Sequence, residues 1–523
     1  MFEALVFRIH GLARWNSNTV RIMGFVEIFL SMMLLIPTLI AMTCGESWVD
    51  FFFMVPFLLG FGIFQTLMFK GEGRISPVMG ILTMTLGWML VFFVCSVPFY
   101  ISGMPWYDAL FEGVSGFTTT GASVIPDIES MPISIMFWRS FSQWIGGIAV
   151  VLVFMFLLPM MGVGGRAFLN NELSRSGTAN FSMKMVGAAK SFIVIYVAFS
   201  VIELILLMIC GVNHFEALCM MMSTISTGGL MVTNDSIAGY SFAVQAIVLI
   251  FMFLGGTNFF LHYRMICRKD YAAYLKSQEF IWTFVWFVMG AAIIMGAVLF
   301  MMPGMANTIG NAGANYWDAL FTIVSIGTST GYTVTDYSQW PFLAAVILWL
   351  AGTFGAMSGS TAGGIKIYRI MIVKSYIING YNKMLHPNDV REVMLDGEPV
   401  DSDAVYATLV IMVSFLVVGL FSILAFMITE PGSSVLDTMG LTIMSLGNVG
   451  AGLGNFGPSA SMVDLSVSTK LIMVFLMWVG RLEVYMALIV FTKGFWKEVM
   501  MNTKKTSNVI SSGRKSLRDY ARK

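Results

Sequence analysis

Charged side chains are the scarcest feature of this sequence. Asp, Glu, Lys and Arg make up only 11% of the 523 residues, whereas 57% are hydrophobic. An ordinary soluble domain carries about a quarter charged residues. Several long stretches contain one charge or none, and about 20 apolar residues suffice for a helix to cross a hydrocarbon core of about 30 Å. The composition excludes a soluble globular protein and indicates an integral membrane protein.

Side chains suited to catalysis or metal binding are few and scattered. The chain has four histidines and five cysteines, and neither set shows the close spacing of a metal site. No Gly-Lys-Ser or Gly-Lys-Thr sequence marks a phosphate-binding loop. The apolar stretches contain no convergent acid, base or metal ligands. We therefore expect no catalytic residues, no enzymatic activity and no nucleic-acid partner.

The few charges are sorted along the chain. Lys and Arg gather in alternate polar segments, and the segments between them hold mainly Asp and Glu, with Arg139 and Lys470 as exceptions. Basic loops favour the cytoplasmic side of a membrane. This pattern predicts a multi-pass protein with both termini in the cytoplasm. The first apolar run, about 22–44, is longer than a signal-peptide core, and we interpret it as a retained anchor.

A short pattern recurs four times in the chain. An acidic residue leads an apolar stretch that ends in Ser or Thr and Gly, and the four acidic markers are Asp108, Glu216, Asp318 and Asp437. A glycine follows thirteen residues after three of these markers, at Gly121, Gly331 and Gly450. The second copy offers both Gly228 and Gly229, at twelve and thirteen. Such matching in four copies predicts four equivalent structural units.

Each copy lies between two long apolar segments. A stretch of roughly a dozen residues spans about 18 Å as a helix, so it can enter the membrane but not cross it. We predict an all-α integral membrane protein in which four pseudo-repeats of helix, re-entrant pore helix with loop, and helix surround one pore. Two extra transmembrane helices, at about 22–44 and 49–69, precede them, giving ten spans. The second helices of the repeats are expected at about 131–160, 241–263, 338–376 and 467–491.

This organisation divides the chain into five parts. The predicted parts are an N-terminal two-helix domain at 1–70, pore repeats at 71–182 and 183–276, a third repeat with an intramembrane gating loop at 277–400, and a fourth repeat with a basic tail at 401–523.

The loop ends of the four copies resemble a cation filter in their chemistry. An alkali cation that sheds its water needs rings of oxygen ligands, and backbone carbonyls supply them where the backbone is irregular. Glycine permits such a backbone. The candidate filter residues are Thr119, Thr120, Gly121, Thr227, Gly228, Gly229, Thr330, Gly331, Asn448, Val449 and Gly450. The alternative is a set of packing glycines. The acidic markers are interpreted first as helix N-terminal stabilisers, and second as residues that draw cations to the pore.

A glycine-rich stretch at 351–364 interrupts the second helix of the third repeat. It is too rich in Gly, Ser and Thr for a plain helix, while the equivalent stretches of the other repeats are more apolar. Irregular backbone at membrane depth must line water or be buried in protein. We therefore predict a movable gate here, with a static helix crossing as the alternative. The candidate gate glycines are Gly352, Gly355, Gly359, Gly363 and Gly364.

Two basic residues extend the candidate gate. Arg481 lies within the last apolar segment, where an arginine is costly unless it faces a cavity or a partner. We expect it to bind carbonyls of the glycine-rich stretch or to place positive charge on the ion path, with a structural ion pair as the alternative. Glu483 is two residues away and on another helix face. Lys366 follows the stretch, either as a gate residue or as an interfacial anchor.

These features together resemble the Trk/Ktr/HKT superfamily of cation transporters, and within it the TrkH-type bacterial potassium uptake subunits. The resemblance rests on the motifs at 116–121 and 223–229, the interrupted helix, and Gly480-Arg481-Leu482-Glu483. It implies K⁺ held by carbonyls of the filter residues, a gate at 352–364 and control of that gate by Arg481. Sodium-preferring relatives often have serine where this chain has Gly121.

The resemblance also implies partners and a location. It implies a homodimer in the lipid of the bacterial cytoplasmic (inner) membrane, and a nucleotide-sensing, TrkA-like cytoplasmic ring. Segments 386–400 and 493–523 are candidate contacts for that ring, although the basic tail could equally be solvated or face lipid. A coupled K⁺/H⁺ or K⁺/Na⁺ symporter remains the alternative function, with Glu27, Glu203 or the filter region as the coupling site.

Overall fold

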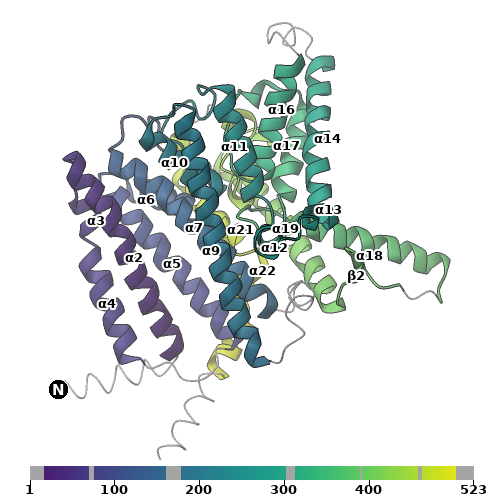
Figure 1. Ribbon diagram of the computed structural model, residues 1–523, viewed down its shortest axis with the longest axis horizontal. Helices are drawn as coiled ribbons and strands as arrows, with labels where there is room; N and C mark the ends of the chain where they lie inside the picture. The colour runs from purple at the N-terminus through teal and green to yellow at the C-terminus, as the bar shows by residue number, and fades with distance from the viewer. Residues whose placement is uncertain are drawn as a thin grey trace, which may run out of the picture. The chain divides into compact units, whose positions relative to one another are not determined.

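The structure is a computed structural model, and it describes residues 17–69, 76–160, 178–301, 312–388, 391–457 and 462–501. Nearly all of its regular structure is helical (Figure 1). The chain forms two compact units. We call residues 1–98 with 485–523 the terminal unit, and residues 99–484 the central unit. The five-part division made from the sequence stays a prediction.

The terminal unit contains a pair of closely packed helices. Its elements are α2 (Ser17–Cys44), α3 (Val49–Phe52), α4 (Val55–Met68), most of α5 (Pro77–Ile101) and α22 (Tyr485–Ile489). A β-carbon built on Gly24 of α2 would lie 2.8 Å from the carbonyl oxygen of Gly62 in α4, so both glycines permit close approach. Beside them, Gln65 Nε2 donates to Glu27 Oε1 at 3.0 Å. The Glu27 carboxylate thus serves a contact between helices.

The central unit contains the four copies of the short pattern and most of the helices around them; most of α5, expected as the first helix of the first repeat, and α22 belong to the terminal unit. The first has α6 (Trp106–Phe117) and α7 (Ile133–Met160); the second has α9 (Thr178–Ile209), α10 (His214–Ile225), α11 (Phe242–Gly255) and α12 (Phe259–Arg268). The third has α13 (Ala273–Lys276), α14 (Gln278–Met301), α16 (Ala312–Gly327), η1 (Tyr337–Gln339), α17 (Phe342–Phe354) and α18 (Ile367–Leu385). A hairpin of β1 (Met394–Leu395) and β2 (Glu398–Pro399) leads to the fourth, with α19 (Ser402–Thr429), α20 (Val435–Leu446), η2 (Gly454–Phe456), η3 (Met462–Asp464) and α21 (Val467–Arg481). The all-α fold class is confirmed.

Seven helices of the described residues are long and apolar enough to cross a membrane, or eight if α11 and α12, which meet at 95°, count as one span. The two other predicted spans, at 338–376 and 467–491, are divided into shorter helices and do not pass this length test. The predicted break between α17 and α18 is present, but α11 also ends at Gly255, and α21 ends at Arg481. The Asn258 side chain accepts from Phe260 N at 3.0 Å and starts α12 in a new direction. After α21, Glu483 and Val484 take left-handed φ values of 58° and 51°.

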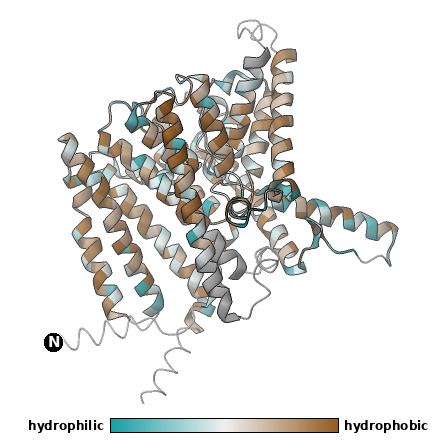
Figure 2. Cartoon of the chain, viewed as in Figure 1, coloured by the Kyte–Doolittle hydropathy of each residue, from teal (hydrophilic) through white to brown (hydrophobic). Residues whose placement is uncertain are grey.

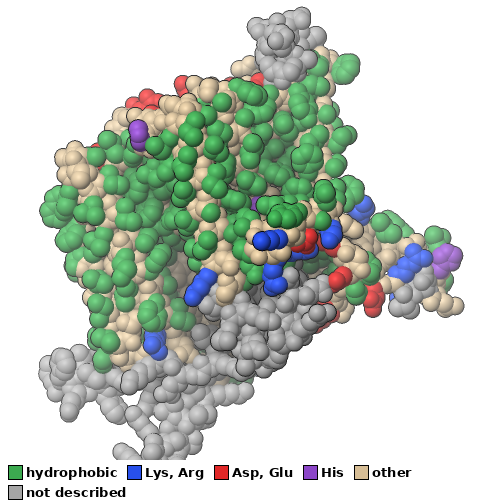
Figure 3. Space-filling view, in the orientation of Figure 1, with side chains coloured by type: hydrophobic (Ala, Val, Ile, Leu, Met, Phe, Trp, Pro, Cys, Tyr) green, Lys and Arg blue, Asp and Glu red, His purple; other side chains and the backbone are tan. Residues whose placement is uncertain are grey.

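The outer helices of the central unit expose apolar side chains. Helices α9, α11 and α14 are coloured mainly as hydrophobic in Figure 2. Figure 3 shows hydrophobic side chains over the same helices, with Lys and Arg gathered near α12 and α18. Phe300 is 88% exposed, Ile428 79% and Ile209 74%. So much exposed apolar surface is stable only in contact with lipid.

Candidate functional site

The four short helices α6, α10, α16 and α20 end in the same turn. In each, an N–H donates to the carbonyl five residues earlier: Thr120 to Ser115, Gly228 to Ser223, Thr330 to Ser325 and Val449 to Met444, at 2.8–3.2 Å. The residue before each donor has a left-handed φ: Thr119 50°, Thr227 53°, Ser329 57° and Asn448 52°. This is the Schellman helix ending, in which that position is usually Gly or Asn. Threonine there is strained by roughly 1–2 kcal/mol, so surrounding contacts must hold it.

A second left-handed residue follows two positions later in every copy. The four residues are Gly121, Gly229, Gly331 and Gly450, with φ of 88°, 76°, 84° and 76°. The structure thereby resolves the ambiguity in the second copy. Gly229 is the counterpart of Gly121, and Gly228 takes the place of Thr120. Ser329, which the sequence analysis did not include among the site residues, is the counterpart of Thr119.

The four loops interlock in a closed ring. A β-carbon built on each glycine would clash with a carbonyl oxygen of the next copy: Gly121 with Gly228 at 1.9 Å, Gly229 with Thr330 at 1.7 Å, Gly331 with Val449 at 2.3 Å and Gly450 with Thr120 at 2.3 Å. The last contact returns from the fourth copy to the first. Glycine is required at all four positions by both φ and space. We call these loops, 119–121, 227–229, 329–331 and 448–450, the four-loop ring.

One carbonyl of the four-loop ring has a protein donor. Gln143 Nε2, on α7, donates to the Gly228 carbonyl at 2.7 Å, and Gln143 Oε1 accepts from Leu230 N at 3.2 Å. Within the described residues, no such bond reaches the counterpart carbonyls of Thr120, Thr330 and Val449. Sequence reasoning missed Gln143, because nothing local distinguishes it from other polar residues on an apolar helix.

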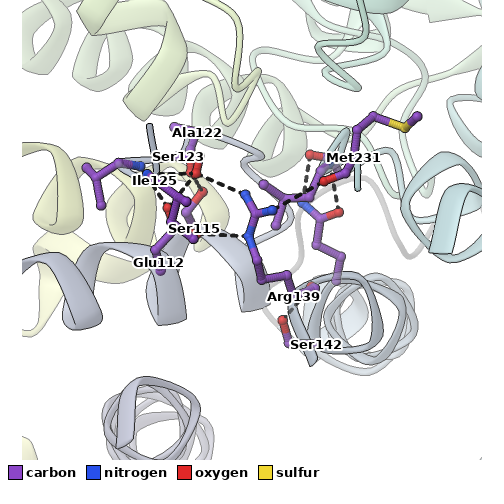
Figure 4. A network of polar contacts seen from close by, with 12 residues as sticks. Glu112, Ser115, Ala122, Ser123, Ile125, Arg139, Ser142 and Met231 are labelled. Carbon is purple, nitrogen blue, oxygen red and sulfur yellow. Dashed lines mark hydrogen bonds and ion pairs between the residues drawn. The ribbon is translucent and has the colours of Figure 1, made fainter. Parts of the chain in front are cut away.

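A buried ion pair joins α6 and α7 (Figure 4). Arg139 Nε on α7 is 3.2 Å from Glu112 Oε2 on α6, and each residue is only 1% exposed. Glu112 Oε1 accepts from Ser123 Oγ at 2.6 Å and from Val124 N at 2.7 Å. Arg139 also donates to Ser123 Oγ at 2.9 Å and to the Met231 carbonyl at 3.2 Å. The pair therefore connects the segments that follow Gly121 and Gly229, and we call it the Glu112–Arg139 clamp.

The glycine-rich segment between α17 and α18, residues 355–366, packs against three of the loops. Thr227 Oγ1 donates to Thr361 Oγ1 at 3.1 Å, and Gly363 N donates to Ser329 Oγ at 2.8 Å. A β-carbon on Gly363 would lie 2.2 Å from the Gly447 carbonyl, next to the fourth loop. Two of these contacts involve the strained left-handed residues. The segment therefore holds part of the ring in place.

The same segment is attached on its other side to the second and third copies. Met357 N donates to the Gly256 carbonyl at 3.1 Å, beside the break between α11 and α12. Ser358 donates to Glu279 of α14 through its N–H at 2.6 Å and its hydroxyl at 3.0 Å. Lys366 is 2% exposed, and its Nζ donates to the Ala362 carbonyl. Its interpretation as an interfacial anchor is therefore wrong, because an anchor must reach the aqueous surface.

Arg481 contacts the first loop, 119–121, which segment 355–366 does not contact. Its guanidinium donates to Thr119 Oγ1 at 2.5 Å, and its Nε has no partner among the described residues. The described hydrogen bonds do not include the expected contact with carbonyls of the glycine-rich segment. Glu483 forms an ion pair with Arg369 of α18 instead. The charge of Arg481 thus lies against the ring itself.

Three of the four acidic markers have different partners. Asp437 forms a capping box with Ser434 at the start of α20, which confirms the helix-stabilising interpretation for this copy. Asp108 Oδ1 is 2.7 Å from Lys470 Nζ, and Glu216 accepts from the Tyr240 hydroxyl at 3.0 Å. Lys470 and Arg139 were the basic exceptions in the acidic segments of the sequence, and each forms a buried ion pair.

The loops beyond the ring join the first two copies. Asn234 Nδ2 donates to Asp127 Oδ1 at 2.9 Å, and Ile128 N donates to Asn234 Oδ1 at 2.9 Å. The hydrogen bond from Asn234 lowers the pKa of the Asp127 carboxyl below its ordinary value. This aspartate therefore stays negatively charged at neutral pH.

Comparisons with known proteins agree with this architecture. The family model described as "TrkH: Cation transport protein" matches residues 80–499. The Trk system potassium uptake protein TrkH of Escherichia coli (strain K12) is 29% identical over 488 residues, covering 91% of this chain and 99% of that protein. TrkG of the same strain is 27% identical, with 92% and 100% covered. The crystal structure of the potassium transporter TrkH from Vibrio parahaemolyticus matches with a TM-score of 0.82 and 26% identity, covering 92% of this chain and 99% of that one. The chain belongs to the TrkH family of cation transport proteins.

Proposed function

We propose that this protein takes up K⁺ across the cytoplasmic membrane through the four-loop ring. The relatives named as potassium uptake proteins support potassium as the ion. The observation that carries the proposal is the closed contact of each ring glycine with a carbonyl of the next copy. Such a ring offers backbone oxygens from four chain segments to one ion.

The chemistry of the ring suits a dehydrated monovalent cation. Carbonyl oxygens can replace the water shell of K⁺, and their number and spacing determine which ion is favoured. The C-terminal ends of α6, α10, α16 and α20 add partial negative charge at the ring. No covalent step is needed, so transport rather than catalysis is the function that these residues support.

We propose that segment 355–366, with Lys366, and Arg481 together gate the ring. The segment binds at Thr227 and Ser329, and Arg481 binds at Thr119. A guanidinium beside the ring repels an entering cation. Movement of the segment or of Arg481 would remove support from the strained residues and open the path. We also propose that a second protomer and a TrkA-like ring, which would bind at 386–400, control this gate. Both termini would lie in the cytoplasm. Residues 389–390 and 502–523 of these regions lie outside the described residues.

Coupled symport remains a second candidate, because of Glu203. This α9 residue is 0% exposed, and neither carboxyl oxygen has a hydrogen-bond partner among the described residues. The nearby Thr224 hydroxyl donates to the Met220 carbonyl instead. A buried carboxyl group without a partner is a candidate proton carrier. Glu27, in contrast, is engaged with Gln65.

Ion flux into liposomes tests both candidates. Purified protein should carry K⁺ and Rb⁺ well and Na⁺ poorly, and equal fluxes would contradict selectivity by the ring. Gly121→Ser should reduce the Rb⁺ over Na⁺ preference, because Gly121 has no room for a side chain. Gly296→Ser on α14, where no atom lies within 4 Å of the added carbon, is the matched control and should behave as wild type. Rb⁺ accumulation driven by a pH gradient, and its loss in Glu203→Gln, would favour symport instead.

A further inference from the structure

A cavity of about 560 Å³ lies between α14, α17 and α18, outside the four-loop ring. Its size falls in the range of small-molecule sites, about 300–1,000 Å³. The walls are mainly apolar and include Trp282, Trp286, Phe354 and Ile367, and the hairpin residues Met394 and Leu395 close one side. An apolar cavity of this size at the edge of a membrane protein suits an aliphatic chain.

A lysine supplies the charge of the cavity. Lys374 lines it, and its Nζ lies 4.6 Å from the centre of the Trp282 ring. The indole of Trp286 forms part of the wall, but its Nε1 is buried and does not open into the cavity. The cavity therefore offers one cation to a ligand with anionic oxygens.

The position of the cavity along α14 fixes its depth. Gln278, the first residue of this membrane-spanning helix, lines the cavity together with Trp282, one turn further on. Tryptophan and lysine at the end of a span are typical of the level of lipid headgroups. Trp282 is 49% exposed and so faces the surroundings of the protein. The cavity thus lies where both acyl chains and phosphate groups are present.

We propose that this cavity binds one anionic phospholipid. An acyl chain lies against the apolar walls, while the phosphate oxygens pair with the Lys374 ammonium. A free inorganic anion would leave the apolar walls empty, and a neutral lipid would leave the lysine charge unmatched. Phe354 ends α17 and Ile367 begins α18, so the bound lipid contacts both helix ends that flank segment 355–366. The inference does not depend on which ion the ring conducts.

Lipid retention by the full chain tests the proposal. The protein is exchanged into detergent with phosphatidylglycerol or phosphatidylcholine and measured by native mass spectrometry. We expect one phosphatidylglycerol retained per chain, in preference to phosphatidylcholine. Lys374→Met should weaken phosphatidylglycerol retention about fivefold, the loss expected for one basic residue at an anionic surface. Trp286→Ala should weaken retention of both lipids, because it removes part of the apolar wall.

Matched variants separate the site from general effects. Lys383→Met lies on the same helix outside the cavity, and Trp349→Ala removes a tryptophan of α17 that does not line it. Both should retain lipid as the wild type does. Ser375→Trp should fill the cavity and abolish retention. Unchanged retention in Ser375→Trp, or equal retention of the two lipids, would overturn the proposal. A third result would also overturn it: Ser375→Trp protein that still retains lipid but no longer self-associates in light scattering. A second copy of the chain, rather than a lipid, would then occupy the cavity.

Discussion

Glu112 and Arg139 form a fully buried ion pair, 3.2 Å apart, that contacts the segments following two loops of the four-loop ring. Breaking a buried pair by removing one partner typically costs about 3–5 kcal/mol, because it leaves an uncompensated charge. The clamp also joins Ser123 to Met231. Its residues should therefore affect selectivity as well as stability.

Glu112→Gln should lower both the thermal midpoint of unfolding and the Rb⁺ over Na⁺ flux ratio in liposomes. The Arg139 charge then has no carboxylate partner. The hydrogen bonds that Ser123 and Val124 donate to residue 112 are lost or become weaker, because a neutral amide oxygen is a weaker acceptor than a carboxylate. Glu27→Gln, which alters a buried carboxyl of the terminal unit, is the control: it should lower stability without changing the ratio. An unaltered flux ratio in Glu112→Gln would assign the clamp to stability alone.

Gln143→Leu should shift selectivity through the Gly228 carbonyl. The substitution leaves this oxygen and Leu230 N without their partner, at about 1–3 kcal/mol for a buried unpaired group. We expect a lower Rb⁺ over Na⁺ ratio, because one of four ring carbonyls loses its fixed orientation. Gln245→Leu is the comparison, since Gln245 bonds to Trp317 and Tyr240 instead. An equal Rb⁺ over Na⁺ flux ratio in both variants would exclude a role for Gln143 in the selectivity of the ring.

Arg481→Ala should raise Rb⁺ flux when no regulatory partner is present. It removes positive charge beside Thr119, and with it a repulsion that acts on the entering cation. Arg481→Lys keeps the charge and should stay close to the wild-type flux, so the pair of variants separates charge from hydrogen bonding. Flux that is the same in all three proteins would exclude Arg481 from gating.

Gly363→Ala tests the fit of the glycine-rich segment beneath the ring. The added methyl group would lie 2.2 Å from the Gly447 carbonyl, so the segment must move away. We expect higher Rb⁺ flux without a partner, measured on the same vesicles. Gly380→Ala in α18 meets no atom within 4 Å and should leave flux unchanged. Lower or equal flux in Gly363→Ala would indicate a structural segment rather than a gate.

The sequence determined the elements that depend on local signals. Apolar length gave the membrane helices, and the acidic marker thirteen residues before a glycine gave four equivalent short helices. The break after α17 was also readable, because its glycines and hydroxyls follow one another in the chain. In each case, the residues that specify the structure lie within one or two helical turns of each other.

Only the tertiary structure decided what depends on contacts between distant copies. The choice of Gly229 over Gly228 follows from the left-handed backbone and from the Thr330 carbonyl, which lies a hundred residues away along the chain. The partners of Arg139, Lys470 and Arg481 were likewise invisible, since a buried charge shows its need for a partner but not which one satisfies it. Closure of the ring requires each loop to fit the next, and no single copy contains that information.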